Sequence, residues 1–494
     1  MSERRAELVE GIAVVEPGTV NAAAAATRQF PAGFVWGAAT AAFQVEGSTT
    51  ADGRTDSIWD AFCRLPGVIV GGQTGEPGAD HYRRMREDVA LMSELGLTSY
   101  RFSVSWPRVR PDGGAVNERG LDFYRRLVDE LLAAGIAPWV TLYHWDLPQA
   151  LEEQGGWTSR DTAQRFAAYA DTVHAALGDR VPYWTTLNEP WCSAFLGYAS
   201  GEHAPGQSEP RAAVAAAHHL LLAHGLASAA LRARDPRTTL GITLNLSPVR
   251  ALDPGDPADV EAVRRIDGLQ NRLFLEAILR GAYPSDVVAD LEPYGLSEHL
   301  HDGDLESISV PLDLLGVNYY QGTLVSGHPR SDRAEPAPLT TAGVPRPSPP
   351  ASPWVGAEHV TFHFRGRPVT GMDWEVYPEG LTELLTSLSG QYRGVPLYVT
   401  ENGAAYPDSV RGGTVDDPQR LSFIAAHVRA VREAIDAGTD VRGYFVWSLL
   451  DNFEWAWGYG CRFGIVYVDY ETQQRIPKSS ARWYASLISQ NSLP

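Results

Sequence analysis

Short apolar runs that end in a polar or charged residue recur eight times along this chain, with helix-like segments between them. Most of the runs are almost continuously apolar, which is typical of parallel strands buried on both faces. The predicted strands are Phe34–Thr40, Ser99–Trp106, Pro138–Trp145, Tyr183–Glu189, Thr239–Leu246, Leu312–Tyr320, Val395–Asn402 and Val441–Asp451. Eight strands alternating with helices predict an α/β fold, a single (β/α)₈ TIM barrel.

The segments between the strands carry apolar residues at helical spacing, and several are followed by glycine, a frequent residue after the last helical turn. The predicted helices are Tyr82–Leu95, Leu121–Ala134, Asp161–Leu177, Ala212–Arg234, Gln270–Arg280, Glu379–Ser389 and Arg420–Ala437. A doubly wound open sheet is the structural alternative, but no Gly-x-Gly-x-x-Gly turn follows the first strand.

One domain accounts for nearly all of the 494 residues. We assign it to residues 29–490, because barrels with insertions reach this size and no second domain is visible. Residues 1–28 are interpreted as a flexible leader, since their mixed charges and short apolar run do not resemble a secretory signal. Cys63, Cys192 and Cys461 lie far apart in the chain. They indicate reduced thiols in a cytoplasmic protein rather than a disulfide framework.

The charge balance narrows the range of partners. The chain carries 60 acidic and 41 basic residues, a net charge of −19. This field repels nucleic acid and anionic lipid, and it favours a neutral small-molecule substrate. We find no apolar stretch of membrane-spanning length. Because His218, His219 and His224 lack a matching carboxylate face, we predict no metal site there. No cofactor is expected either.

Barrel enzymes place their active sites at the carboxyl ends of the strands. Polar and aromatic residues lie within or just past those ends in this chain, namely Gln44, Arg101, His144, Asn188, Glu189, Asn318, Tyr320, Glu401 and Trp447. We therefore expect these side chains to converge on one mouth of the barrel.

Two of these residues are glutamates, and each is followed by a residue that turns the chain away, in Glu189-Pro190 and Glu401-Asn402-Gly403. Two carboxyl groups about 5–5.5 Å apart are the minimum equipment for cleaving a glycosidic bond with retention. One attacks the anomeric carbon; the other protonates the departing oxygen and later deprotonates a water molecule. The negative neighbour raises the pKa of the acid, which keeps it protonated until the nucleophile is esterified.

The segment from His328 to Pro368 contains nine prolines and few periodic apolar positions. Because it follows the sixth predicted strand, we expect it to form a rigid wall or lid over the mouth; a flexible surface insert is the alternative. Contacts to the leaving group are expected from this segment and from the loop Trp191–Gly206.

In combination, the motifs of this chain resemble those of family 1 glycoside hydrolases, the β-glucosidase family. The resemblance extends from about Phe30 to Tyr484. The motifs are Phe34-Val35-Trp36-Gly37-Ala38-Ala39-Thr40, Gln44-Val45-Glu46-Gly47, Tyr100-Arg101-Phe102-Ser103-Val104-Ser105-Trp106, His144-Trp145-Asp146-Leu147-Pro148, Asn188-Glu189-Pro190, Asn318-Tyr319-Tyr320, Thr400-Glu401-Asn402-Gly403, Trp447-Ser448 and Asn452-Phe453-Glu454-Trp455.

This resemblance implies a role for each residue of the predicted site. Glu401 would be the nucleophile and Glu189 the acid/base, while Arg101 and Tyr320 would orient the Glu401 carboxylate. Asn188 would bind the sugar 2-hydroxyl. The other residues that the resemblance places at the substrate are Gln44, His144, Asn318, Trp447, Glu454, Trp455 and Phe463.

The implied activity is that of a retaining, exo-acting β-glucosidase on small β-glucosides and cello-oligosaccharides, with side activity on β-galactosides and β-fucosides. Glu454 favours a neutral sugar, because members that act on 6-phosphosugars replace it. A transglycosylase would carry the same residues, so that alternative stays open. An inactive sugar-binding barrel would need a lost carboxylate, and none is lost. The preferred aglycone, glucose tolerance and oligomeric state are not determined by these patterns.

Overall fold

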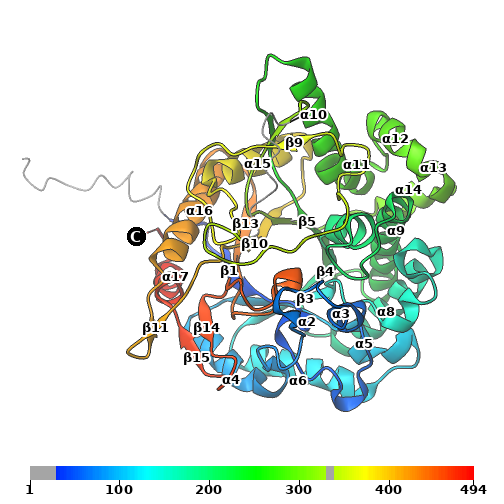
Figure 1. Ribbon diagram of the computed structural model, residues 1–494. Helices are drawn as coiled ribbons and strands as arrows, with labels where there is room; N and C mark the ends of the chain where they lie inside the picture. Colours follow the sequence, from blue (N-terminus) through cyan, green and yellow to red (C-terminus); the bar gives the residue numbers. More distant parts are fainter. Residues whose placement is uncertain (1–28, 330–338, 494) are drawn as a thin grey trace, which may run out of the picture.

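The computed structural model describes residues 29–329 and 339–493, so the predicted leader at 1–28 lies outside the described residues. At its centre eight parallel strands close into a barrel in the order β1-β13-β10-β7-β5-β4-β3-β2 (Figure 1). The barrel strands are β1 (Val35–Ala39), β2 (Ser99–Ser103), β3 (Ala137–Tyr143), β4 (Tyr183–Asn188), β5 (Thr239–Asn245), β7 (Leu314–Asn318), β10 (Leu397–Asn402) and β13 (Val441–Trp447). The predicted (β/α)₈ barrel is confirmed.

Each predicted strand overlaps one barrel strand, but two predictions run too far. The strand β2 ends at Ser103, because Trp106–Val109 forms the short helix α5 with a proline in its first turn. The strand β13 ends at Trp447, where the chain leaves the barrel. Apolar composition continues beyond both ends because these loop residues are buried as well.

Helices surround the barrel on its outside (Figure 1). The predicted helices correspond to α4 (His81–Glu94), α6 (Glu118–Ala133), α8 (Arg160–Leu177), α9 (Pro210–Arg234), α11 (Leu273–Arg280), α15 (Pro378–Gln391) and α16 (Pro418–Asp436). The structure adds α10 (Pro257–Asp267), α12 (Ser285–Leu291), α13 (Leu296–His299), α14 (Asp304–Ile308) and α17 (Ser479–Gln490), which the pattern did not predict. Gly96 and Gly135 adopt left-handed φ angles of 72° and 74° just after α4 and α6, as expected for helix ends.

The interior of the barrel is closed at one end by aromatic side chains. The Trp139 ring lies 5.1 Å from the Tyr398 ring and 5.2 Å from the Phe445 ring. Its indole N–H donates a hydrogen bond to Thr185 Oγ1 over 2.6 Å, so the buried polar atom is satisfied. These residues precede the strand ends, so the polar side chains at the carboxyl ends lie above an apolar floor.

The helix α9 corrects one sequence expectation. Its 25 residues are long and apolar enough to cross a membrane, contrary to our prediction that no such stretch exists. However, 83% of its most apolar window is buried, and it packs against α8 and against the π-helix η5 (Cys192–Ser200). Its apolar surface is therefore used inside the fold, as in a core helix. His218, on this helix, faces Asp304 with its Nε2 3.0 Å from Oδ2.

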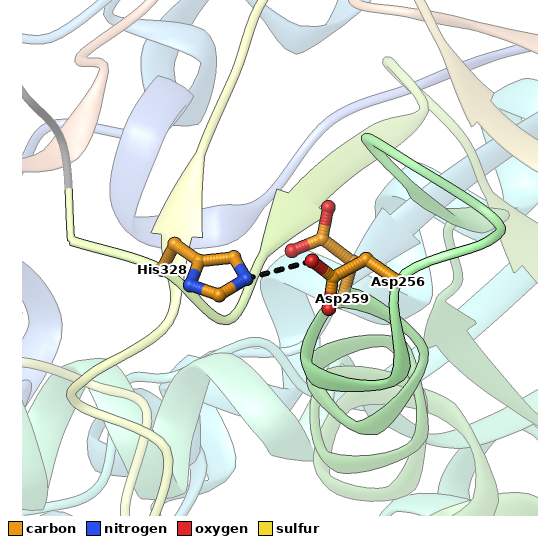
Figure 2. Close-up of side chains that lie close together, drawn as sticks. All are labelled: Asp256, Asp259 and His328. Atoms are coloured by element: carbon orange, nitrogen blue, oxygen red, sulfur yellow. Dashed lines mark hydrogen bonds and ion pairs between the residues drawn. The ribbon is translucent and has the colours of Figure 1, made fainter.

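A cluster of potential ligand atoms lies near the start of α10, where Asp256, Asp259 and His328 approach one another (Figure 2). Asp256 caps the helix by accepting a hydrogen bond from the Ala258 N–H over 2.7 Å, and its other oxygen lies 2.9 Å from His328 Nε2. Asp259 accepts a hydrogen bond from Ser326 Oγ over 2.5 Å. The carboxylates are thus occupied in joining α10 to the strand β8 (Thr323–Ser326).

Candidate active site

The two predicted glutamates face the same opening of the barrel. Glu401 lies within β10 and pairs in register with Asn318 of β7, whereas Glu189 directly follows β4. In both strands the pairing register shifts close to the glutamate, between Val399 and Glu401 and between Thr185 and Asn188. Such irregularities re-aim side chains near active sites.

The Glu401 carboxylate is held at both oxygens. Arg101 donates a hydrogen bond from Nη1 to Oε1 over 2.6 Å, and the Tyr320 hydroxyl donates to Oε2 over 2.7 Å. Arg101 is fully buried, and its Nη2 donates to Asn188 Oδ1 over 2.6 Å. A charged, two-sided clamp of this kind favours the ionised form and fixes the direction of its lone pairs.

Glu189 is held in an unusual backbone conformation. Its φ of 47° lies in the left-handed region, which costs a non-glycine residue conformational energy. Its N–H donates to the Thr243 carbonyl over 2.9 Å, which helps to keep it in place. The side chain accepts hydrogen bonds from Asn318 Nδ2 at Oε1 over 2.6 Å and from Cys192 Sγ at Oε2 over 3.3 Å.

A chain of hydrogen bonds between neighbouring side chains links the two carboxyl groups. Arg101 joins Glu401 to Asn188, and Asn318 Nδ2 donates to Asn188 Oδ1 over 3.1 Å as well as to Glu189. The Thr400 hydroxyl donates to Asn318 Oδ1 over 2.8 Å and so turns the amide N–H groups of Asn318 towards the site. Four strands thereby set the relative position of the pair.

Burial and mutual repulsion separate the protonation states of the pair. Burial, followed by the charge of Glu401, raises the pKa of Glu189 to about 8. Burial also raises the pKa of Glu401, but the charge of Arg101 and the hydrogen bonds from Tyr320 and Arg101 oppose this rise. Near neutral pH the arrangement favours a protonated Glu189 beside an ionised Glu401, one acid and one nucleophile.

A second group of predicted residues lines the cavity beside the pair. The His144 ring is stacked on Trp447 with ring centres 5.7 Å apart, and Trp447 forms part of the cavity wall. Gly403 makes this arrangement possible, because a β-carbon there would lie 1.7 Å from the Trp447 carbonyl oxygen. Trp455 and Phe463 also line the cavity and are buried.

Several buried polar atoms in this region have no hydrogen-bond partner within the described part of the chain. They include Gln44 Oε1, His144 Nδ1 and Glu454 Oε2. Gln44 is oriented by donating from Nε2 to the Phe453 carbonyl over 2.7 Å. Burial, then the charges of Glu401 and Glu189, raises the pKa of Glu454 to about 8. Unpaired buried polar atoms are costly, and hydroxyl groups of a ligand could pair with them.

The cavity has a volume of about 500 Å³ and extends beyond the predicted residues. Of those residues, Arg101, Gln44 and Asn188 are buried behind the wall rather than in it. The wall also contains residues that we did not predict individually, namely Trp191, Glu202, Asn245, Gln270, Trp354 and Trp374. Asn245 ends β5, so the strand-end rule could have identified it. Trp191 lies at the start of η5, and Gln270 lies in a second π-helix. Glu202, Trp354 and Trp374 lie on loops, where no periodic signal marks them.

The proline-rich segment contributes to this wall. Trp354 lines the cavity and packs against Trp191, with ring centres 5.0 Å apart. Phe362, in the short strand β9 (Thr361–Phe362), lines it as well. The described part of the segment therefore forms a side of the cavity, as expected for a wall, while residues 330–338 lie outside the described residues.

Comparison with known proteins gives consistent matches over nearly the whole chain. A family model described as glycosyl hydrolase family 1 matches residues 26–493. The thermostable β-glucosidase B of Thermobispora bispora is 50% identical over 99% of this chain and 96% of that protein. A bifunctional β-D-glucosidase/β-D-fucosidase of Bifidobacterium breve is 47% identical over 94% of this chain and 99% of its own length. The crystal structure of a psychrophilic β-glucosidase from Micrococcus antarcticus superimposes with a TM-score of 0.91 at 57% identity, covering 94% of this chain and 98% of that one.

Proposed function

The chain belongs to glycosyl hydrolase family 1, and from this premise we propose that it is a retaining, exo-acting β-glucosidase. The observation that carries the proposal is the pair of glutamates joined by hydrogen bonds. Arg101 and Tyr320 hold the Glu401 carboxylate, and burial together with the charge of Glu401 raises the pKa of Glu189. A double displacement requires these two groups: a nucleophile, and a second carboxyl group that acts as acid in the first step and as base in the second.

In the first step Glu401 attacks the anomeric carbon of a β-glucoside while Glu189 protonates the departing oxygen. A covalent glycosyl-enzyme forms, and the negative charge of Glu401 disappears into the ester. The pKa of Glu189 then falls because its repelling neighbour is gone. Glu189 can now deprotonate a water molecule, which attacks the same carbon and releases glucose with its original β configuration.

The substrate contacts follow from the wall of the cavity. Trp447 offers a flat apolar face to a sugar ring, and Glu454, Gln44 and His144 offer unpaired polar atoms to its hydroxyl groups. Asn188 is held just behind this wall by Arg101 and Asn318, and its assignment to the 2-hydroxyl is part of the proposal; that contact would strengthen in the transition state. An enclosed polar end of this kind suits one terminal glucosyl unit rather than the middle of a polymer.

Location and physiological role are further parts of this proposal. The three cysteines are free and buried, which supports a cytoplasmic location. Cello-oligosaccharides fit an exo-acting β-glucosidase, and we therefore propose a role in the late steps of cellulose breakdown. The bifunctional relative from Bifidobacterium breve supports side activity on β-fucosides.

The stereochemistry of cellobiose hydrolysis tests the proposed function. We expect the first glucose released from the non-reducing end to be the β anomer, because two displacements restore the configuration. Proton NMR during the first minutes of reaction, before mutarotation, distinguishes the two anomers. A panel of 4-nitrophenyl glycosides should show turnover of β-glucoside, β-galactoside and β-fucoside and none of α-glucoside. Initial release of α-glucose would mean that a water molecule lies between the carboxyl groups, contrary to direct attack.

The pH dependence of the reaction gives a second test. We expect kcat/KM to fall above about pH 8, where Glu189 loses the proton that the leaving group needs. In Glu401→Gln the repelling charge is removed, so the pKa of Glu189 should fall towards the ordinary range of a glutamic acid. Carbon-13 NMR titration of the Glu189 carboxyl measures this value in both proteins. An equal or higher pKa in the variant would contradict the electrostatic coupling.

A further inference from the structure

The cavity continues past the catalytic pair into a part built largely from connecting segments outside the barrel strands. Trp191 and Glu202 come from the region after β4, Gln270 from the π-helix η6 (Gly268–Arg272), and Trp354 from the proline-rich segment. Trp191 and Trp354 pack against each other and so join two of these loops into one wall. This outer part surrounds the space that a leaving group would occupy, because the strand-end residues already account for the terminal sugar.

Glu202 stands out in this outer wall because its charge has no counterpart. Its backbone is held by a hydrogen bond from its N–H to Ser200 Oγ over 3.2 Å, next to Gly201 with a left-handed φ of 71°. The carboxylate, however, pairs with no donor among residues 29–329 and 339–493. Burial raises the pKa of Glu202, and no neighbouring cation or hydrogen bond opposes that rise. A partly buried carboxylate of this kind, open to the cavity and without a protein donor, is free to accept hydrogen bonds from a ligand.

The position of Glu202 follows from the segments around it. It lines the cavity on the connection between β4 and α9, which also carries Trp191. The proline-rich segment that carries Trp354 contacts this connection, because the Ala351 N–H donates a hydrogen bond to the Ser200 carbonyl over 3.2 Å. Trp191 follows Glu189 by two positions and lines the same cavity. Since Glu189 is the residue that protonates the leaving group, we take this wall to border the space of the leaving group.

The described titratable residues that line the cavity offer no positive partner for Glu202. Among the described residues that line the cavity there are four glutamates and no lysine or arginine. Three of them, Glu189, Glu401 and Glu454, serve the terminal sugar, and Glu202 is the one left over. Glu189 and Glu454 are largely protonated near neutral pH, and the charge of Glu401 is paired with Arg101, so the Glu202 carboxylate is the unpaired charge among the described residues of this wall. When ionised in this partly desolvated position, it attracts donors and cations and repels anions more strongly than it would in bulk water.

We propose that Glu202 determines specificity for the leaving group: its carboxylate accepts hydrogen bonds from hydroxylated or cationic aglycones and disfavours aglycones that carry a negative charge. The inference rests on the proposed β-glucosidase function and adds a substrate class to it. Neutral aryl groups without a donor lie against Trp191 and Trp354 and depend little on this carboxylate. The neighbouring His203 also lines the cavity, but its pKa is lowered by burial to about 3, so it supplies no compensating charge.

Three aryl β-glucosides that differ in charge test this proposal in the full-length enzyme. They are 4-trimethylammoniophenyl, 4-nitrophenyl and 4-carboxyphenyl β-D-glucoside, and the readout is kcat/KM of Glu202→Gln divided by that of the wild type. We expect a loss of about tenfold for the cationic substrate, a gain of about tenfold for the anionic one, and a change within about twofold for the neutral one. Because each ratio compares the variant and the wild type on one and the same substrate, differences in leaving-group acidity between the three substrates cancel.

The matched control is Glu209→Gln, which removes the same charge from the same connection between β4 and α9. Glu209 is exposed, lies at the start of α9 and is not part of the cavity wall. This variant should leave all three ratios unchanged. Glu202→Lys provides a second variant, which should shift the cationic and anionic ratios further in the same directions. Thermal unfolding monitored by circular dichroism verifies that each variant is folded.

Each outcome decides a specific point. Equal changes for the three substrates in Glu202→Gln would overturn the proposal, because a purely structural role would not discriminate by charge. The same pattern in Glu209→Gln would also overturn it, since the effect would then come from the net charge of the protein. A wild-type enzyme that turns over none of the three glucosides would instead contradict the β-glucosidase function on which the inference rests.

Discussion

Glu401→Gly is expected to lower kcat/KM for aryl β-glucosides by a factor on the order of 10⁵ or more, the scale on which loss of a nucleophile acts in enzymes. Arg101 and Tyr320 would then face an empty space instead of a carboxylate. A small anion such as azide can occupy that space and attack the anomeric carbon from the same side. Because only one displacement follows, the product is α-glucosyl azide. Steady-state kinetics with 2,4-dinitrophenyl β-glucoside and NMR of the product measure both effects.

The wild-type enzyme with the same azide concentration is the control for this rescue. Its carboxylate fills the position, so no α-glucosyl azide should form. Circular dichroism must show an unchanged fold, since Glu401 is buried and its removal also leaves Arg101 without its partner. Activity of the variant close to that of the wild type would remove Glu401 from the nucleophile role.

Glu189→Ala is expected to separate substrates according to their leaving groups. General acid catalysis contributes about 10²- to 10⁴-fold, and substrates with poor leaving groups should lose a factor in this range. Dinitrophenolate needs little protonation, so formation of the glycosyl-enzyme from 2,4-dinitrophenyl β-glucoside should be nearly unchanged. Its hydrolysis then slows because no base activates water, and an initial burst of dinitrophenol should appear in stopped-flow measurements.

Azide again identifies the missing group, and here the expected product is β-glucosyl azide. In Glu189→Ala the glycosyl-enzyme still forms on Glu401, and azide attacks it from the side that Glu189 occupied. The two variants should therefore give azides of opposite configuration from one substrate. If Glu189→Ala slowed the glycosylation step equally for good and poor leaving groups, its role as acid would be wrong. Identical anomers from both variants would contradict the assignment of the two roles.

The barrel could be predicted because its signal is local. The barrel strands are mostly buried on both faces, so a run of apolar residues such as Leu397–Val399 reports its environment without reference to any other segment. The polar residue that ends each run then marks the carboxyl edge, and the barrel rule places those edges together. In this way Glu189 and Glu401 could be brought to one mouth before any contact between them was known.

The hydrogen-bond chain of the site could not be predicted in the same way. Arg101 and Glu401 are 300 positions apart in the sequence, and their contact depends on the shifted registers of β4 and β10. No periodic pattern encodes a register shift or a left-handed φ such as that of Glu189. The helices α10 and α12 to α14 were missed because they are extra helices between β5 and β7, outside the repeat of one strand and one helix, and α17 after the last strand was missed as well.

The kind of fold and the chemical groups at the mouth of the barrel were readable in the chain before folding, because burial imprints a local pattern on every strand. The family resemblance implied which glutamate is acid and which is nucleophile, but the physical cause of that difference came from the structure, because a pKa depends on the charges that surround a side chain in space. The position of Glu202 in the cavity wall also became visible only there. Electrostatic and hydrogen-bond energies depend on distances between atoms, and those distances exist only once the barrel has closed.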